Sequence, residues 1–455
     1  MKEITLMSEA TKNETSGNGL QKTIGFVPAL AIVIGMVIGS GVFFKPHAVF
    51  TATGAPGLGL IAWVVGGIIT IAGGLTAAEI AAAIPKTGGM VAYLEETYGS
   101  VWGYLLGWTQ TVIYFPATIA ALGIIFSKQV LSLLNLSGGM LIPIAIIVII
   151  FLVIMNSLGS KTGGAIQTIA TIGKLIPLIA IIIMGLLHSG GGAASLLPIT
   201  VADHPIASSM GSALIGIMFA YDGWINVGAI AGEMKNPGKD LPKAIIGGLS
   251  IVMAVYVLIN VAYLFVLPAS ALAATDTPAA DVATILFGAN GGKVITIGIL
   301  VSIFGALNGY IMTGMRIPYA MAVENRIPFS GFFSKLHPKY ETPVNCGILI
   351  TVISIAMSFT GKFDLLTDLA MFVIWIFYVM TFLAVIVLRK TRPDMERPYK
   401  VPLYPVIPLI GILGGIYMII NTMITQPMNA GIGLALALIG LPIYFLKKKQ
   451  ATKAE

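Results

Sequence analysis

The sequence predicts an all-α, multi-pass membrane protein with twelve transmembrane helices, the first ten arranged as two inverted repeats of five. Three observations predict this fold. The chain has 455 residues, of which 57% are hydrophobic and only 10% charged, whereas about a quarter of an ordinary soluble domain is charged. Its apolar residues form long runs between short basic loops. Two of these runs, one in each half, are interrupted by glycine and polar residues.

Each apolar run is near or above the roughly 20 residues that a helix needs to cross the hydrocarbon core. The predicted helices cover residues 24–53, 57–84, 101–127, 139–158, 162–188, 207–232, 242–268, 288–322, 344–360, 364–388, 402–425 and 428–446. The predicted organisation is a tail at 1–23, a first repeat at 24–188, a second repeat at 207–388, two further helices at 402–446 and a tail at 447–455.

The loops predict the orientation of the chain. Most of the 26 Lys and Arg residues fall in the two tails and in the loops on the same side as the tails. The other side has only Lys45, Lys128, Lys293 and Lys362. Basic residues favour the cytoplasmic side, so both termini are predicted to be cytoplasmic, in a cell membrane protein without a cleaved signal peptide. This topology also explains the net charge of +7 without nucleic-acid binding.

The positions of the two interrupted runs predict the repeat. They are the first and the sixth, and because five helices separate their starts, the second unit enters the membrane from the opposite side. Interrupted helices at corresponding places of an inverted repeat are the sequence sign of a secondary transporter's binding site.

The interruptions lie within residues 34–43 and 215–224. A broken helix presents free amides, which suit a carboxylate, and free carbonyls, which suit an ammonium group. Together the two breaks can hold an α-amino acid by its charged ends. The candidate substrate-binding residues are Val37, Ile38, Gly39, Ser40, Gly41, Phe219, Ala220, Tyr221, Asp222 and Gly223. The alternative is that Gly35 and Gly39 only form a GxxxG helix-packing pair.

Asp222 and two further ionisable residues, Lys174 and Glu79, lie within the apolar runs. Asp222 either caps the half-helix after the second break or faces a water-filled cavity. Lys174 should find carbonyls or a carboxylate; it is a candidate proton site or a fixed ammonium that replaces a coupling cation, and the alternative is a snorkelling lysine. Glu79 is expected to be a satisfied interfacial acid.

The sequence gives little support to a disulfide-linked protein, a metalloprotein or an enzyme. The single cysteine, Cys346, excludes an intrachain disulfide and a cysteine metal cluster. There is no nucleophile–base pair or phosphate loop, so no cofactor, metal or enzymatic activity is expected. A non-transporting amino-acid sensor stays open as an alternative.

Several motifs resemble those of the L-type amino acid transporter family of the amino acid–polyamine–organocation (APC) superfamily, over about residues 24–450. They are Gly-Ser-Gly-Val-Phe at 39–43, Ala-Glu at 78–79, Pro-Lys-Thr-Gly-Gly at 85–89 with Tyr93 and Tyr98-Gly99, Phe-Ala-Tyr-Asp-Gly-Trp at 219–224, Glu-Met-Lys-Asn-Pro at 233–237 with Leu241-Pro242, and Ser-Ile-Phe-Gly-Ala-Leu-Asn-Gly at 302–309.

The resemblance implies a LeuT-like fold with helices 1 and 6 unwound, alternating access, and sodium-independent exchange of L-amino acids. By this likeness the substrate carboxylate lies on the amides around Ser40 and Gly41, and its amino group on carbonyls near Val37, Ile38 and Phe219. Phe219 matches an aromatic gate. Lys174 matches a lysine of the family. It would occupy the place where sodium-coupled relatives bind an ion and would reach toward Gly35 and Ser302.

Two departures from the family bear on partners and substrates. Animal members bind a heavy chain through a cysteine after the third helix, and the loop from Phe126 to Gly139 has none. A prokaryotic type without a disulfide-linked partner is therefore expected. Asn226 lies just after the motif that ends at Trp224, at a place where polarity varies between subfamilies. With Phe219 and Tyr256 it is a candidate gate or polar contact, although Tyr256 and Asn260 also suit ordinary helix–helix hydrogen bonds.

The substrates expected are small neutral amino acids such as alanine, serine, cysteine and glycine, because Phe219 and Tyr221 crowd the breaks. A proton-coupled symporter and an exchanger of larger neutral amino acids are the alternatives.

Overall fold

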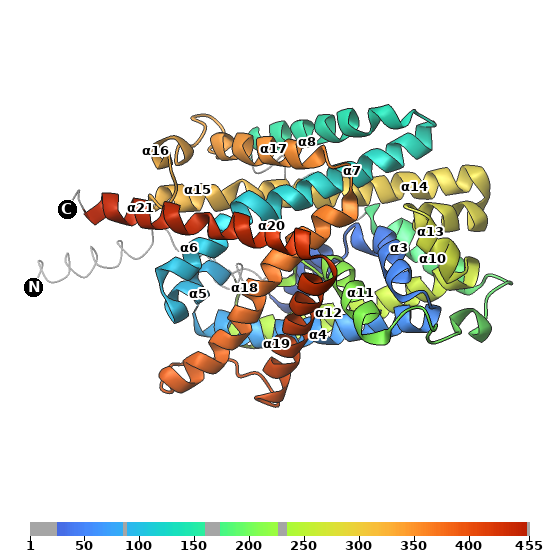
Figure 1. The fold of residues 1–455 in the computed structure, drawn as a ribbon, viewed down its shortest axis with the longest axis horizontal. Coiled ribbons are helices and arrows are strands. Elements are labelled where there is room, and N and C mark those ends of the chain that lie inside the picture. Colours follow the sequence, from blue (N-terminus) through green and yellow to red (C-terminus); the bar gives the residue numbers. More distant parts are fainter. Residues whose placement is uncertain (1–24, 85–88, 160–172, 226–233, 453–455) are drawn as a thin grey trace, which may run out of the picture.

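The computed structural model describes residues 25–84, 89–159, 173–225 and 234–452, and the regular structure in this part is almost entirely helical (Figure 1). Its elements are α2 (Phe26–Val37), α3 (Gly41–Thr53), α4 (Pro56–Ala83), α5 (Met90–Tyr98), α6 (Ser100–Thr109), η1 (Gln110–Tyr114), α7 (Phe115–Leu134), η2 (Gly138–Met140), α8 (Leu141–Ser157), α10 (Leu175–Leu186), η3 (Ala193–Leu196), α11 (Ile206–Ala220), α12 (Pro237–Val266), α13 (Ala269–Ala274), α14 (Pro278–Gly314), α15 (Arg316–Val323), α16 (Ser330–Phe333), α17 (Val344–Ser358), α18 (Phe363–Thr391), α19 (Val406–Thr425), α20 (Pro427–Leu438) and α21 (Gly440–Thr452).

The helices confirm a multi-pass membrane protein. Among the described residues, 8 helices are long and apolar enough to cross a membrane, and the bent pair of α2 and α3 makes a ninth candidate span. Three shorter apolar helices, α10, α11 and α17, fall in the predicted runs 162–188, 207–232 and 344–360. Every predicted run thus contains a helix, while the number twelve and the inverted repeat stay predictions.

Two helix boundaries differ from expectation for local reasons. Helix α12 begins at Pro237 rather than at residue 242, because proline is tolerated in the first turn of a helix, where its missing N–H has no partner to lose. Helix α14 begins at Pro278, but Gly288 inside it is non-helical (φ 70°, ψ 174°). The predicted start at residue 288 coincides with this kink.

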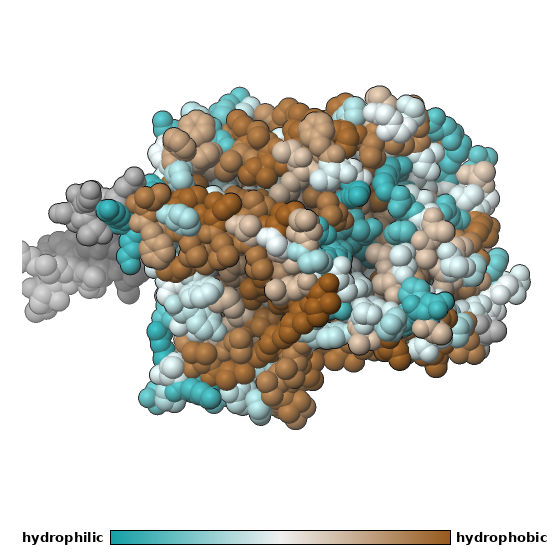
Figure 2. Space-filling view, viewed as in Figure 1, coloured by the Kyte–Doolittle hydropathy of each residue, from teal (hydrophilic) through white to brown (hydrophobic). Residues whose placement is uncertain are grey.

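The helices pack into two groups. Helix α12 packs against both α2 and α4 in one group, α7, α8, α14 and α17 pack against one another in the other, and α18 contacts members of both groups. Helix α3 packs along α11, which brings the two interrupted runs together between the groups. Apolar residues cover much of the visible surface, while hydrophilic residues gather toward the two ends and in one central patch (Figure 2). An apolar exterior of this kind suits lipid contact.

Candidate functional site

The first break lies between α2 and α3. Helix α2 ends at Val37, and Ile38 leaves the helical conformation (φ −68°, ψ 97°). Helix α3 then starts at Gly41, bent by 48° from α2. The carbonyls at the end of α2 and the amides at the start of α3 therefore have no helical partners.

The second break begins where α11 ends at Ala220. Gly223 follows with φ +103°, a conformation that glycine adopts readily and other residues adopt under strain. The half-helix predicted after this break, and Asn226 with it, lie outside the described residues.

The two breaks touch each other through their backbones. A Cβ atom added to Gly41 would lie 2.5 Å from the Cα of Ala220, and one added to Gly223 would lie 3.0 Å from the carbonyl oxygen of Met36. A Cβ on Gly39 would meet nothing closer than 3.8 Å. Close backbone contact therefore requires glycine at position 41, and Gly39 is not held by tight helix packing.

Tyr256 of α12 bonds to the free carbonyls of both breaks. Its hydroxyl oxygen lies 3.0 Å from the carbonyl oxygen of Val37 and 2.8 Å from that of Ala220. A hydroxyl has one proton to donate, so one carbonyl is left able to accept from another donor. Asn260, by contrast, donates to the Tyr256 carbonyl oxygen of its own helix, at 2.7 Å.

Lys174, just before α10, reaches the first break. Its ammonium donates to the carbonyl oxygens of Gly35 and Ile38, and the residue is only 5% exposed. These contacts fit a fixed ammonium better than a snorkelling lysine, which would extend to the membrane surface. Ser302 is also buried, and its hydroxyl has no hydrogen-bond partner in the described structure.

Asp222 joins the second break to three other helices. Tyr114 and Tyr310 donate to its Oδ2, the latter at 3.0 Å, and Tyr378 donates to its Oδ1 at 2.8 Å. The donors come from η1, α14 and α18. Asp222 is 4% exposed, so in this conformation its carboxylate is satisfied by hydroxyls rather than by a water-filled cavity.

These three tyrosines are site residues that the sequence analysis missed. Tyr114 ends η1, a five-residue π-helical turn between α6 and α7. Such turns shift the register of the side chains after them and recur at functional sites. One feature of the sequence could have indicated them: a tyrosine inside an apolar run needs a hydrogen-bond partner for its hydroxyl.

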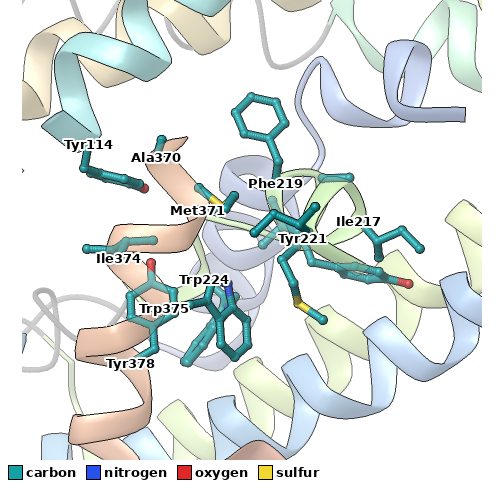
Figure 3. Packing of buried hydrophobic residues seen from close by; sticks show 14 of the residues in the cluster. Tyr114, Ile217, Phe219, Tyr221, Trp224, Ala370, Met371, Ile374, Trp375 and Tyr378 are labelled. Atoms are coloured by element: carbon teal, nitrogen blue, oxygen red, sulfur yellow. The ribbon is translucent and has the colours of Figure 1, made fainter. Parts of the chain in front are cut away.

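Aromatic side chains line the second break. The rings of Tyr221 and Tyr256 lie 5.0 Å apart, and that of Trp63 lies 5.5 Å from Tyr256. Figure 3 shows Phe219, Tyr221 and Trp224 on the break and Ala370 to Tyr378 on α18 facing this region. A pocket opens near the end of α4, lined by Ala77, Ala78, Ala81, Tyr93, Trp224, Ile225, Leu241 and Ile245.

Lys45 was counted among the loop residues in the sequence analysis, and the structure corrects this. It lies inside α3 with no exposed surface, and its ammonium contacts Asp364 at 2.7 Å. A lysine near the end of an apolar run looks like an interfacial residue in sequence. Its partners on α18 are more than 300 residues away, which explains why they escaped notice.

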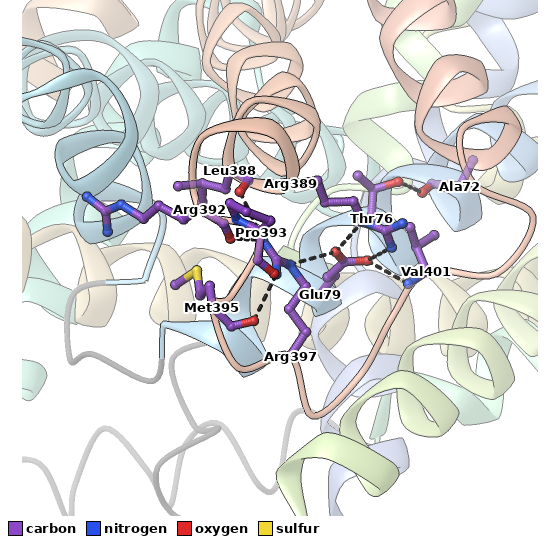
Figure 4. A network of polar contacts seen from close by, with 10 residues as sticks. All are labelled: Ala72, Thr76, Glu79, Leu388, Arg389, Arg392, Pro393, Met395, Arg397 and Val401. Atoms are coloured by element: carbon purple, nitrogen blue, oxygen red, sulfur yellow. Dashed lines mark hydrogen bonds and ion pairs between the residues drawn. The ribbon is translucent and has the colours of Figure 1, made fainter.

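Glu79, expected to be a satisfied interfacial acid, has several partners (Figure 4). Arg389 donates to both its oxygens, at 2.8 and 2.6 Å, and the backbone amide of Val401 donates at 2.7 Å. Arg397 lies 3.6 Å away. Glu79 thus ties the end of α4 to the end of α18 and to the segment after it.

The described residues contain no group of three or more His, Cys, Asp or Glu side chains arranged to hold a metal ion. The chemistry that the two breaks offer is hydrogen bonding: free backbone groups, the buried ammonium of Lys174 and the buried carboxylate of Asp222. Such an arrangement can bind and release a small zwitterion by hydrogen bonds alone.

Comparison with known proteins agrees with this description. Residues 24–444 match the family model described as amino acid permease. The serine/threonine exchanger SteT of Bacillus subtilis (strain 168) is 44% identical over 440 residues, which cover 96% of this chain and 100% of that protein. The human large neutral amino acids transporter small subunit 2 is 33% identical, covering 96% and 83%. The mouse Asc-type amino acid transporter 1 is 31% identical, covering 94% and 81%.

Proposed function

The chain belongs to the amino acid permease family, and from this premise we propose that it is a sodium-independent exchanger of small neutral L-amino acids working by alternating access. Membership makes it a membrane transporter of amino acids and not an enzyme. Exchange is supported by the likeness to the Bacillus protein, which is named an exchanger.

The two touching breaks support an amino acid as substrate. The substrate carboxylate would accept hydrogen bonds from the amides at Ser40 and Gly41, at the positive end of α3. Its ammonium would donate to whichever of the Val37 and Ala220 carbonyls Tyr256 leaves unbonded. Both ends of the zwitterion are then held by backbone, and the side chain points toward Phe219, Tyr221 and their neighbours.

The observation that carries sodium independence is the ammonium of Lys174 on the carbonyls of Gly35 and Ile38. Carbonyl oxygens of an unwound helix are the ligands that coupled transporters offer to Na⁺. A covalently fixed positive charge at such carbonyls leaves no place for a mobile one. Without a coupling ion the carrier has no ion gradient to drive net uptake, and the likeness to the Bacillus exchanger supports slow return of the empty carrier and therefore exchange.

Small side chains are favoured because Trp63, Tyr221 and Tyr256 fill the space beside the breaks. A second candidate, an exchanger of larger neutral amino acids, is favoured by the 33% identical human relative. A proton-coupled symporter is a further alternative, in which Lys174 or Asp222 would titrate.

For the arrangement in the cell, we infer a LeuT-like fold with a 5+5 inverted repeat, in the cell membrane, with both termini in the cytoplasm and lipid around it. The distribution of Lys and Arg supports this orientation. The chain would work without a disulfide-linked heavy chain, an inference supported by the cysteine-free loop from Phe126 to Gly139.

Release of labelled substrate tests the substrate class. Proteoliposomes loaded with labelled L-serine are diluted into sodium-free buffer containing one unlabelled amino acid at a time. Alanine, serine, glycine and cysteine should release the label, while leucine and phenylalanine should release little. Release by leucine and phenylalanine alone would favour the second candidate, and equal release into buffer without amino acid would contradict exchange.

A further inference from the structure

The segment between α15 and α17, residues 324–343, is called the interfacial loop below. It exposes three large apolar side chains: Phe329, Phe332 and Leu336 are 80%, 53% and 40% exposed. Phe329 and Phe332 are three residues apart at the short helix α16, and this spacing places them on one face. Exposed apolar side chains that gather in one place mark a surface that binds lipid or another protein.

The backbone fixes the outward position of Phe329. Its φ is +56°, a left-handed conformation that is unusual for a bulky residue. The amides of Phe332 and Phe333 donate to the Phe329 carbonyl oxygen at 2.8 and 3.1 Å, and the Ser330 hydroxyl donates to the Ile327 carbonyl oxygen at 2.5 Å. Such a conformation persists only where the surrounding contacts determine it.

The interfacial loop is also fixed to neighbouring helices. Asn345 of α17 donates to the carbonyl oxygen of Phe332 at 2.8 Å. Arg326 binds both carboxylate oxygens of Glu95 on α5, at 2.9 and 3.1 Å. The exposed rings therefore belong to a segment with defined contacts on both sides of α16.

The ends of two apolar helices place the interfacial loop at the boundary between membrane and water. Helices α14 and α15 form one candidate span that ends at Val323, and α17 is an apolar helix that starts at Val344. Val323 is exposed, as are Ile348 and Val352 of α17, so an apolar surface suited to lipid continues onto the loop. Phe and Leu side chains are typical of segments that lie in the membrane interface.

The charges of the interfacial loop favour an anionic partner. Lys335 and Lys339 are exposed. Of the two acids in this segment, Glu324 pairs with Arg326 at 2.6 Å, which leaves Glu341. Basic side chains beside an apolar surface are attracted to anionic lipid headgroups.

The basic end of α21 lies beside the interfacial loop. Lys447 donates to Asn325 Oδ1 at 2.9 Å, and Lys449 follows two residues later in the same helix. Figure 1 shows α16 and the end of α21 at the same end of the molecule. These lysines add positive charge at the depth where lipid headgroups lie.

We propose that the interfacial loop is a binding site for anionic phospholipid. Phe329, Phe332 and Leu336 insert into the boundary between headgroups and acyl chains, and Lys335 and Lys339 contact the negative headgroups. Lipid is the occupant that fits, because the exposed rings continue the apolar surface of α15 and α17 and have lysines beside them. This binding lies beyond the proposed exchange and does not depend on it.

A fluorescent reporter beside the rings tests lipid contact without requiring transport. Cys346→Ser removes the single cysteine and keeps a donor for the Phe333 carbonyl oxygen, which the thiol contacts at 3.2 Å. Gly331→Cys then carries the polarity-sensitive fluorophore NBD at an exposed position, where an added Cβ meets no atom within 4 Å. The whole chain is reconstituted into vesicles of phosphatidylcholine, alone or mixed with phosphatidylglycerol. Matched vesicles carry lipids with a nitroxide quencher near the headgroup in both leaflets.

The nitroxide lipids should quench the fluorophore, and more strongly when phosphatidylglycerol is present. The quenched fraction gives the ratio of inserted to exposed loop. Lys335→Gln and Lys339→Gln should each lower this ratio by about fivefold in phosphatidylglycerol vesicles and leave it unchanged in phosphatidylcholine. Phe329→Ser combined with Phe332→Ser should lower quenching in both kinds of vesicle.

Lys362→Gln is the matched control. Lys362 is an exposed lysine at the N-cap of α18, beyond the end of α17 that is opposite to the interfacial loop. Its removal changes the net charge equally and should leave quenching unchanged. Lysine variants of the loop that behave like Lys362→Gln would overturn the binding of anionic headgroups.

Two other outcomes would overturn lipid as the occupant. Fluorescence typical of water, without quenching in any vesicle, would show a loop that stays in solution. Blue-shifted emission without quenching by nitroxide lipids would show that protein covers the loop.

Exchange of labelled serine, measured in the same vesicles, separates this proposal from the proposed function. Absent quenching together with intact exchange would overturn lipid binding alone. Quenching that depends on phosphatidylglycerol, in a protein that does not exchange amino acids, would support lipid binding and overturn the exchanger.

Discussion

At the scale of single residues, the proposed mechanism depends most on Lys174. Its ammonium satisfies two carbonyls that the broken first helix leaves free. A buried acceptor without its donor costs about 1–3 kcal/mol. Because both carbonyls belong to the break itself, loss of Lys174 places that cost on the conformation in which these carbonyls are buried.

Lys174→Ala should therefore slow the interconversion of the two conformations more than it weakens binding. We expect exchange to fall at least about tenfold, corresponding to roughly 1.4 kcal/mol, with a smaller change in substrate affinity. Exchange rates measured from each face, together with equilibrium binding, check this. Unaltered exchange kinetics on both faces would contradict the role given to Lys174.

Asp222 is the second residue with a distinct prediction, because its carboxylate accepts hydrogen bonds from three tyrosines. Asp222→Asn leaves only one oxygen acceptor for them and should lower the free energy of unfolding by about 1–3 kcal/mol. Tyr378→Phe removes one donor and should cost less. Thermal unfolding in detergent compares them. An Asp222→Asn variant as stable as the parent would contradict a stabilising role for the Asp222 carboxylate.

At the scale of elements, the contact of the two breaks depends on a missing side chain. Gly41→Ala would drive a Cβ to 2.5 Å from the Cα of Ala220, a backbone atom that cannot move aside, whereas Gly39→Ala has 3.8 Å of room. We expect the first variant to lose nearly all exchange and the second to retain most of it. The release assay with labelled serine measures both, and equal activity would show that the breaks need not touch.

The segment after α18 gives a second prediction about elements. Glu79→Gln would weaken the charge-assisted bonds from Arg389 and remove the ionic attraction to Arg397. Buried charge-assisted bonds contribute about 1.5–3 kcal/mol each, so the segment 392–405 should open more often. Hydrogen exchange at Val401, whose amide donates to Glu79, should speed up, while amides in the middle of α4 should not change.

At the scale of the whole molecule, sequence patterns predicted the helices and the breaks because both are local. Long apolar runs require helices in lipid, and glycine with polar residues marks where they unwind. The pairing of the tyrosines with Asp222 and of Lys45 with its partners could not be predicted, because these hydrogen bonds join residues separated by 88 to 322 positions. The π-helical turn at Tyr114 also leaves no periodic signal in sequence.

In the proposed mechanism a fixed lysine replaces a coupling ion, and one amino acid enters only as another leaves. Uptake of labelled L-alanine into proteoliposomes in sodium-free buffer at matched pH tests it most directly, with one set empty and one preloaded with L-alanine. Uptake confined to preloaded vesicles is the predicted result. Equal uptake into empty and preloaded vesicles would contradict it.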